Sequence, residues 1–265
     1  MQEDRNNEPL LLREDAGGVV RLTLNRPRSY NSLSNELLAA LEADLDSLAE
    51  DRSARVVVLA GAGDRAFCAG HDLKEIGASR RREALTDLFT RCSRVMVKLT
   101  RLPQPVIARV HGIATAAGCQ LVAACDLAVC ADDARFAASG VKYGLFCSTP
   151  MVALSRNLPR KPAVEMLLTG DFVDAAEALR LGLVNRVVPA AELDAAVAAL
   201  CARLLDKPRE VLALGKRAYY RQLEMGLEDA YAFTTEVIVG NALGPDFEEG
   251  LAAFVGKRKP SWPDT

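Results

Sequence analysis

Three continuous apolar runs constrain the fold of this chain most strongly. They are RVVVLAG (55–61), PVIARV (105–110) and DLAVCA (126–131), which are rich in valine, leucine and isoleucine and show little polar alternation. Such runs are typical of strands covered on both faces, as in a parallel sheet. Segments with helical periodicity lie between and beside them, including one from about Arg82 to Leu102. Strands that alternate with helices predict an α/β fold with largely parallel strands.

The pattern changes at about residue 161. From there onward the sequence is mostly helical in pattern, interrupted by one short predicted strand, LVNRVVP. We therefore expect an α/β core over residues 1–160 and a helical C-terminal region over residues 161–265. The last predicted helix, near DFEEGLAAFVGKRKP, ends in a cluster of cations.

Composition narrows the classes of function. The formal net charge is −2 and half of the residues are hydrophobic, which allows a sizeable core and disfavours nucleic-acid binding over the whole surface. The seven cysteines form no C-x-x-C pair, and two histidines are too few for a Cys/His zinc set, so we expect reduced, buried thiols and no metal. No apolar run reaches the roughly 18 residues of a transmembrane helix. The N-terminus lacks a targeting pattern, although a trimmed chain would look the same.

Two loops follow predicted parallel strands, GAGDRAFCAGHDLKEI after the first run and HGIATAAGCQ after the second. Ligands of α/β folds bind beyond the carboxyl ends of strands. Each loop leads into a helix, whose first turn presents free backbone N–H groups. One N–H from each loop could converge on a single oxygen atom and form an oxyanion hole. The small residues Ala114, Ala116, Ala117 and Gly118 suit such a site, but close packing of a helix on a strand requires small residues equally.

Five stretches in order along the chain carry a family resemblance. AFCAGHDLKE, QPVIARVHG, GCQLVAACD, MLLTG and FVGKRKP resemble the enoyl-CoA hydratase/isomerase, or crotonase, superfamily, and the resemblance runs from about Val19 to Pro260. It implies a crotonase-like spiral of ββα units with a C-terminal helical trimerisation region, assembled as a homotrimer or a dimer of trimers. It also implies an acyl-CoA thioester as the ligand, no other cofactor, and a role in fatty-acid metabolism in the mitochondrion.

The same resemblance implies the positions that bind the ligand. The oxyanion donors would be the backbone N–H groups of His71 and Ala117, although Ala117 stands where the family favours glycine. The loop along the thioester and the CoA arm would comprise His71, Asp72, Leu73 and Lys74. The cations implied for the CoA phosphates are Arg28 and, from the C-terminal helix, Lys257.

Two positions depart from the hydratases that the chain resembles. Those enzymes use two glutamates to move the protons of water, and the corresponding residues here are Gln120 and Gly140. An amide does not take up a proton near neutral pH, and glycine has no side chain. The single-glutamate isomerases of the family also use the position of Gly140. Because one general acid–base group contributes about 10²–10⁴-fold to a rate, we expect little or no enoyl-CoA hydratase activity.

Other functions stay open. The amides of His71 and Ala117 could support an enolate-stabilising decarboxylase or a thioesterase, or the chain could be a non-catalytic acyl-CoA sensor or partner subunit. Tyr143 or Cys147 could donate a proton or attack the thioester, but a structural role suits each as well. Asp72 could exchange a proton or only orient its loop.

RNA binding is a further alternative. Arg91, Arg94, Lys98 and Arg101 share one face of the predicted helix that begins near Arg82. One relative in the family is known for binding RNA through a basic helix in this part of the chain. The competing interpretation is a solvated face near acidic neighbours or CoA phosphates. No aromatic residue stands between these cations, which disfavours the stacking that single-stranded nucleic acids require.

Overall fold

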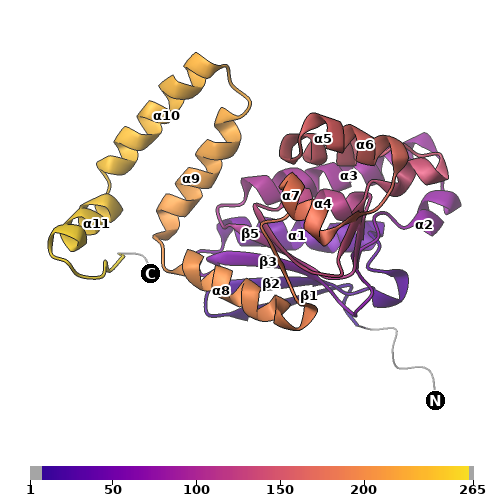
Figure 1. Ribbon diagram of the computed structural model, residues 1–265, viewed down its shortest axis with the longest axis horizontal. Coiled ribbons are helices and arrows are strands. Elements are labelled where there is room, and N and C mark those ends of the chain that lie inside the picture. The colour runs from indigo at the N-terminus through magenta and orange to yellow at the C-terminus, as the bar shows by residue number, and fades with distance from the viewer. Residues whose placement is uncertain (1–7, 263–265) are drawn as a thin grey trace.

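Two sheets form the centre of the computed structural model, which describes residues 8–262 (Figure 1). The larger sheet has six strands in the spatial order β1 (Leu11–Ala16), β2 (Val19–Leu24), β3 (Val56–Gly61), β5 (Val106–Val110), β7 (Leu127–Ala131), β10 (Arg186–Val188). The smaller has four, in the order β4 (Ala66–Cys68), β6 (Ile113–Thr115), β8 (Arg135–Ala137), β9 (Val173–Asp174). Only β1 and β9 run antiparallel to their neighbours among these strands. The predicted α/β fold with largely parallel strands is confirmed.

Consecutive strands are divided between the two sheets. The first strand of each pair β3/β4, β5/β6 and β7/β8 lies in the larger sheet, and the second lies in the smaller one. A helix follows each pair: α2 (Leu73–Ala78), α4 (Ala117–Ala124) and α5 (Ser148–Asn157). This is the spiral of ββα units that the resemblance implies. The strands β9 and β10 complete the edges of the two sheets, so the sheets continue past residue 160.

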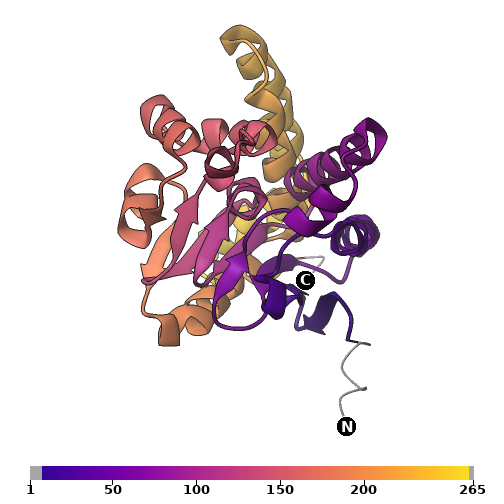
Figure 2. The same ribbon diagram turned by 90° about the vertical axis from the view of Figure 1, so that its right-hand side faces the viewer.

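The remaining helices cover the sheets. Those of the core are α1 (Asn35–Glu50), α3 (Arg82–Arg101), α6 (Arg160–Thr169), α7 (Ala175–Leu181) and α8 (Leu193–Leu205). Ser34 caps α1 by accepting a hydrogen bond from the N–H of Leu37, and the leucine stripe of α1 is buried. Figure 2 shows α1 and α3 on one side of the strands, with the helices of residues 148–181 on the other.

The continuous apolar run of β3 is explained by the two layers that cover it. All six residues of this strand are buried. Val57 and Leu59 belong to the main core, whereas Val56 and Val58 pack in a second cluster with Leu193 and other residues of α8. A strand with helices on both faces cannot place polar residues on either, so the alternation of a half-exposed strand is absent.

Three of the four cations of α3 that raised the RNA alternative face acidic residues of α1. Arg94 contacts Glu42 at 2.7 Å, Arg91 lies 3.8 Å from the same carboxylate, and Lys98 pairs with Asp46. These ion pairs agree with the interpretation of a solvated face beside acidic neighbours.

The last helices form an arm that extends away from the sheets (Figure 1). They are α9 (Arg209–Gln222), α10 (Leu227–Ala242) and α11 (Pro245–Val255). The arm is attached through Lys216 of α9, a buried cation whose Nζ lies 2.6 Å from Asp126 Oδ2. The same Nζ donates hydrogen bonds to the carbonyl oxygens of Leu99 and Gln104, and the hydroxyl of Tyr220 donates to Asp126 Oδ1. A buried charge paired and hydrogen-bonded in this way fixes the start of the arm on the core.

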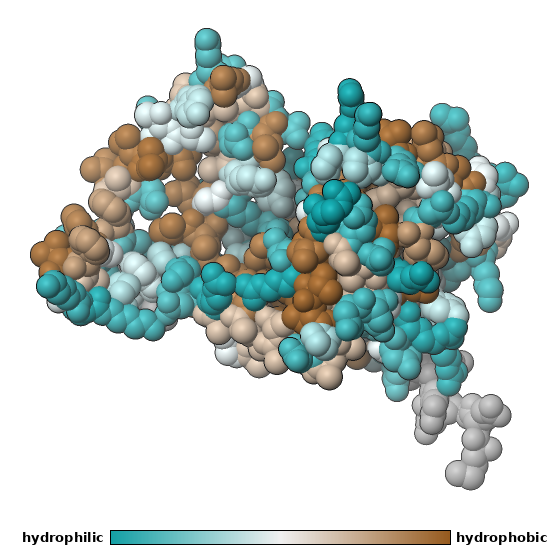
Figure 3. Space-filling model, in the orientation of Figure 1, coloured by the Kyte–Doolittle hydropathy of each residue, from teal (hydrophilic) through white to brown (hydrophobic). Residues whose placement is uncertain are grey.

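Beyond α9 the arm presents large apolar side chains to solvent. Leu243 is 84% exposed and Phe254 is 82% exposed, and Leu227, Ile238 and Val255 are exposed as well. Figure 3 shows this apolar surface as brown patches over α10 and α11. Contiguous exposed apolar surface of this kind is typical of interfaces between chains.

The cysteines are buried and free in the described part of the chain, as expected of reduced thiols. Over residues 8–262, no helix has the length and the apolar character needed to cross a membrane. Over the same residues, no three His, Cys, Asp or Glu side chains come together as a group that could hold a metal ion.

Candidate active site

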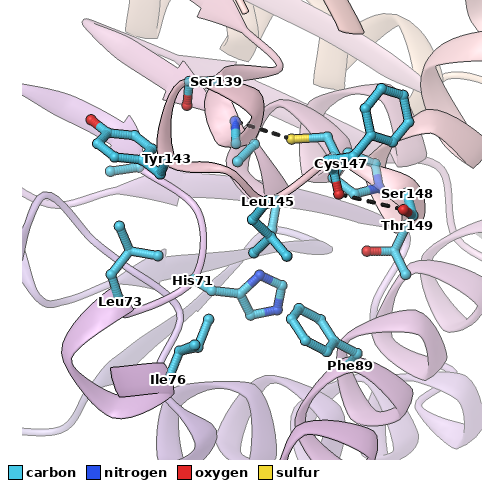
Figure 4. A pocket seen from close by; sticks show the side chains of 16 residues that line it. His71, Leu73, Ile76, Phe89, Ser139, Tyr143, Leu145, Cys147, Ser148 and Thr149 are labelled. Carbon is cyan, nitrogen blue, oxygen red and sulfur yellow. Dashed lines mark hydrogen bonds between the residues drawn. The ribbon is translucent and has the colours of Figure 1, made fainter. Parts of the chain in front are cut away.

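An apolar cavity of about 310 Å³ opens where the loops after β4 and β6 meet the segment before α5. Figure 4 shows His71, Leu73, Ile76 and Phe89 on one side of this cavity, with Tyr143 and Leu145 across from them. Its walls also include Ala116 and Ala117, and no aspartate or glutamate of residues 8–262 lines it. The volume lies within the range of small-molecule pockets, about 300–1,000 Å³.

Two backbone amides at this cavity have no hydrogen-bond acceptor in the described part of the chain. Ala117 begins α4, so its N–H has no acceptor within the helix. His71 forms an isolated parallel bridge with Leu33. The two hydrogen bonds of this bridge involve the neighbours of His71 and not His71 itself. Leu33 N donates to Gly70 O, and Asp72 N donates to Leu33 O. The N–H groups of His71 and Ala117 themselves donate to no atom of residues 8–262.

The two loops that carry these amides touch each other. A Cβ atom placed on Gly70 would lie 2.9 Å from Ala116 Cβ and 3.2 Å from the amide nitrogen of Ala117. Gly70 also has a φ of +90°, which favours glycine. The residue before one free amide therefore packs directly against the residue before the other, and this arrangement has the parts that an oxyanion hole requires.

Ala116, at the cavity, has a strained backbone conformation that the sequence did not reveal. Its φ of +49° and ψ of −117° place an alanine in a region that favours glycine. The strained residue directly precedes Ala117, so its ψ angle sets the direction of the Ala117 N–H. Such strain persists only where the surrounding structure enforces it, and it concentrates at functional sites. Only a glycine at this position would have signalled the conformation in the sequence.

Asp72 orients the loop that carries His71. Its Oδ1 accepts a hydrogen bond from the N–H of Lys74 and caps α2, and its Oδ2 lies 2.9 Å from Arg26 Nη2. Burial opposes ionisation of this carboxyl, but the hydrogen bonds from Arg26 and Lys74 outweigh it and lower the pKa of Asp72. The carboxylate is thus held ionised by structural partners, which favours the orienting role over proton exchange.

The side chain of His71 projects into the cavity. Its ring meets the ring of Phe89 edge-on with centroids 5.0 Å apart, and its Nε2 is buried without a hydrogen-bond partner among the described residues. Burial lowers the pKa of His71 to about 4, so the ring is neutral at pH 7.

Gln120 is buried and its side chain is already engaged. It is 3% exposed, and its Nε2 donates a 3.0 Å hydrogen bond to the carbonyl oxygen of Thr149 in α5. Its Oε1 has no partner within residues 8–262, and Gln120 is not among the residues that line the cavity. The amide therefore links α4 to α5 in this arrangement.

Gly140 leaves no room for a side chain in the present loop conformation. A Cβ atom there would lie 2.9 Å from Cys147 Sγ and closer still to the carbonyl oxygen of Leu145. The N–H of Gly140 donates to Cys147 Sγ at 3.3 Å. Burial raises the pKa of the Cys147 thiol despite this hydrogen bond, which disfavours the thiolate needed for nucleophilic attack.

The other predicted site residues are spread over the molecule. Leu73 lines the cavity and Lys74 follows it on the exposed side of α2. Tyr143 stands at the rim and is 72% exposed. Arg28 is exposed in the 3₁₀ turn Pro27–Ser29. Lys257 follows α11, which Figure 1 places at the opposite end of the molecule from α2, so one chain does not bring Lys257 to its own cavity.

Comparison with known proteins agrees with this architecture. The enoyl-CoA hydratase/isomerase family model matches residues 14–265. The mitochondrial enoyl-CoA hydratase domain-containing protein 3 of Xenopus laevis is 44% identical over 254 residues, which cover 96% of this chain and 86% of that protein. The crystal structure of the human protein of the same name superposes with a TM-score of 0.93 at 42% identity, covering 96% of this chain and all of that one.

A bacterial structure is also similar. A crystal structure described as an enoyl-CoA hydratase of Mycobacterium smegmatis is 57% identical and superposes with a TM-score of 0.94, covering 96% of this chain and 99% of that one. The matching family model, these relatives and the ββα spiral lead to one conclusion. The chain belongs to the enoyl-CoA hydratase/isomerase family and has the crotonase fold.

Proposed function

We propose that this protein binds acyl-CoA thioesters, polarises their carbonyl group, and hydrates enoyl-CoA slowly or not at all. The observation that carries the proposal is a cavity where two free backbone amides meet and no carboxylate of the described part of the chain lines the wall. The thioester oxygen would accept hydrogen bonds from the N–H groups of His71 and Ala117, and the acyl group would lie against the apolar wall.

The chemistry follows from the groups that are present. A donor aimed at a developing oxyanion contributes about 3–4 kcal/mol in a site that excludes water. Two such donors can stabilise an enolate, but hydration also needs groups that take and give the protons of water. Gln120 is an amide bonded to Thr149, Gly140 has no side chain, and His71 is a weak base because its pKa is about 4.

A second candidate is hydration of enoyl-CoA at a substantial rate, because a similar protein, that of Mycobacterium smegmatis, is described as an enoyl-CoA hydratase. It would require proton-transfer groups other than the two glutamates. The decarboxylase and thioesterase alternatives rest on the same two amides and remain compatible with the cavity. We place the protein in the mitochondrion because relatives such as the Xenopus laevis and human proteins are named mitochondrial. We place it in fatty-acid metabolism because acyl-CoA thioesters are its proposed ligands.

Binding can be measured directly by isothermal titration of acetyl-, octanoyl- and palmitoyl-CoA. We expect dissociation constants in the micromolar range, or about −8 kcal/mol, for at least one chain length. Ile76→Trp fills the cavity and should weaken the binding of octanoyl-CoA more than that of acetyl-CoA. The matched variant Leu168→Trp changes an exposed leucine of α6 that does not line the cavity. Failure of all three ligands to bind the wild type would exclude the proposed function.

We propose that the arm assembles the chain into a trimer or a dimer of trimers. The exposed apolar residues of α10 and α11 would gain about 25 cal/mol for each Å² that a neighbouring chain buries. In such an assembly Lys257 could serve the CoA phosphates of another copy, together with that copy's Arg28. RNA binding receives no support from the paired cations of α3.

Sedimentation equilibrium at micromolar concentration tests the assembly. The wild type should have the mass of three or six chains. Phe254→Asp should shift the mass toward that of the monomer, because it places a charge in the apolar patch that the proposed assembly would bury. Leu168→Asp is the matched control on α6, where an equally drastic change is expected to leave the mass of the assembly as it is. A monomeric wild type would contradict the proposal.

A further inference from the structure

The imidazole of His71 lies in a mostly apolar cavity, where the other polar side chains of the described lining are hydroxyl and thiol groups. Figure 4 shows the ring between Leu145 and Phe89, near the middle of the cavity rather than at its rim. Leu73, Ile76, Phe89, Leu145 and Phe146 supply the large apolar side chains of the wall around it. A residue that only filled this space would serve better without ring nitrogens, because burying them without partners costs free energy.

Both ring nitrogens lack partners within the described residues. Nε2 is fully buried and unpaired, and it lies on the side of Phe89 in Figure 4. Nδ1 also makes no hydrogen bond to residues 8–262, but unlike Nε2 it is not fully buried. Nδ1 is therefore the ring nitrogen that a ligand in the cavity can reach. A ligand group that forms a hydrogen bond with Nδ1 therefore makes an interaction that a hydrocarbon chain cannot make.

The position of the ring on the chain limits which part of a ligand it can reach. The imidazole and the proposed oxyanion donor belong to the same residue, so they are only a few bonds apart. A thioester whose oxygen rests on the His71 amide can therefore offer the ring only atoms close to the carbonyl carbon. The far end of a long acyl chain lies elsewhere in the cavity.

We propose that the His71 imidazole, acting separately from its amide, selects acyl groups that carry a hydroxyl or keto oxygen near the thioester. A neutral imidazole donates through one nitrogen and accepts through the other. No protein group fixes the tautomer here, so the ligand can set it. His71 then determines specificity through its side chain and holds the carbonyl oxygen through its backbone. This inference rests on the proposed binding of acyl-CoA.

The test compares two ligands of equal length, butyryl-CoA and 3-hydroxybutyryl-CoA, by isothermal titration. The readout is the ratio of their dissociation constants for each variant. The wild type should prefer the hydroxylated ligand by about 10-fold, which corresponds to one well-placed hydrogen bond. His71→Phe keeps a ring of similar size against Phe89 but removes both nitrogens, and its ratio should fall to about one.

Two further variants make the result specific. The side-chain amide of His71→Asn places a donor and an acceptor near the position of Nδ1, so part of the preference should return. Thr149→Val removes another hydroxyl from the cavity wall while the imidazole stays, and the preference should persist (Figure 4). Equal binding of the two ligands to the wild type, or an unchanged ratio in His71→Phe, would overturn the inference. Absence of any binding to the wild type would instead refute the proposed function.

Discussion

Crotonyl-CoA should remain largely unhydrated in the presence of this protein during the time in which a family member with two glutamates completes the reaction. We expect a rate constant lower by about 10⁴-fold or more, because each missing acid–base group is worth about 10²–10⁴-fold. The physical reason is that the amides of His71 and Ala117 can stabilise an enolate but cannot move the protons of water. The loss of the enoyl absorbance, with a two-glutamate hydratase assayed in parallel, measures this rate.

Restoring the carboxylates tests the reason for the slow rate. Gln120→Glu places a carboxyl next to the carbonyl oxygen of Thr149, which favours its protonated form, so it supplies an acid more readily than a base. Gly140→Glu needs the loop from Gly140 to Cys147 to shift, because a Cβ there overlaps the Leu145 carbonyl. The double variant should therefore gain measurable activity, but well below that of a hydratase.

Gln120→Ala is the matched control, since it removes the Thr149 hydrogen bond without adding a carboxyl. If the wild type hydrates crotonyl-CoA rapidly, and the Gln120→Ala and Tyr143→Phe variants do so as well, then other residues move the protons. The proposal of a slow or absent hydratase activity would then have to be abandoned.

Gly118→Ala should both destabilise the protein and abolish acyl-CoA binding. A Cβ on Gly118 would lie 2.7 Å from the carbonyl carbon of Cys68 and closer still to its oxygen. The overlap is with backbone, so no rotamer relieves it, and α4 must move away from β4. We expect a loss of about 3 kcal/mol or more, at the upper end for single substitutions. Because α4 carries the Ala117 amide, the two donors would separate as well.

Urea denaturation and titration with octanoyl-CoA measure the two effects. Gly77→Ala is the matched control, because a Cβ at this exposed position in α2 meets nothing within 4 Å. Glycine within a helix is unfavourable by about 0.5–1 kcal/mol relative to alanine, so this variant should not lose stability. Stability of Gly118→Ala equal to that of the wild type would show that the close approach of α4 to β4 is not as described.

The sequence predicted those features of the fold that depend on local pattern. The apolar run of β3 and the leucine stripe of α1 indicate which faces of these elements are buried. Helices on both sides of the sheet leave β3 without an exposed face. The cap at Ser34 and the helix from Arg82 follow from side-chain chemistry within a few residues. The family resemblance, rather than periodicity, supplied the ββα spiral.

The finer geometry of the site could not be predicted in this way. The positive φ of Ala116 is imposed by contacts with residues distant in sequence, and alanine gives no sign of it. The hydrogen bond between Gln120 and Thr149 depends on how α5 docks on α4. The distance of Lys257 from the cavity depends on the direction of the arm, which Lys216 sets through a buried ion pair with Asp126.

Infrared difference spectroscopy of bound crotonyl-CoA, labelled at the carbonyl carbon, shows whether the two amides hold the thioester oxygen and whether hydration follows. We expect the carbonyl stretch to move to lower frequency on binding, because two amides polarise the bond, and the shifted band to persist. An unshifted carbonyl band would show that the His71 and Ala117 amides do not hold the thioester oxygen. Rapid replacement of the enoyl bands by those of the hydrated product would show that the protein is an efficient hydratase.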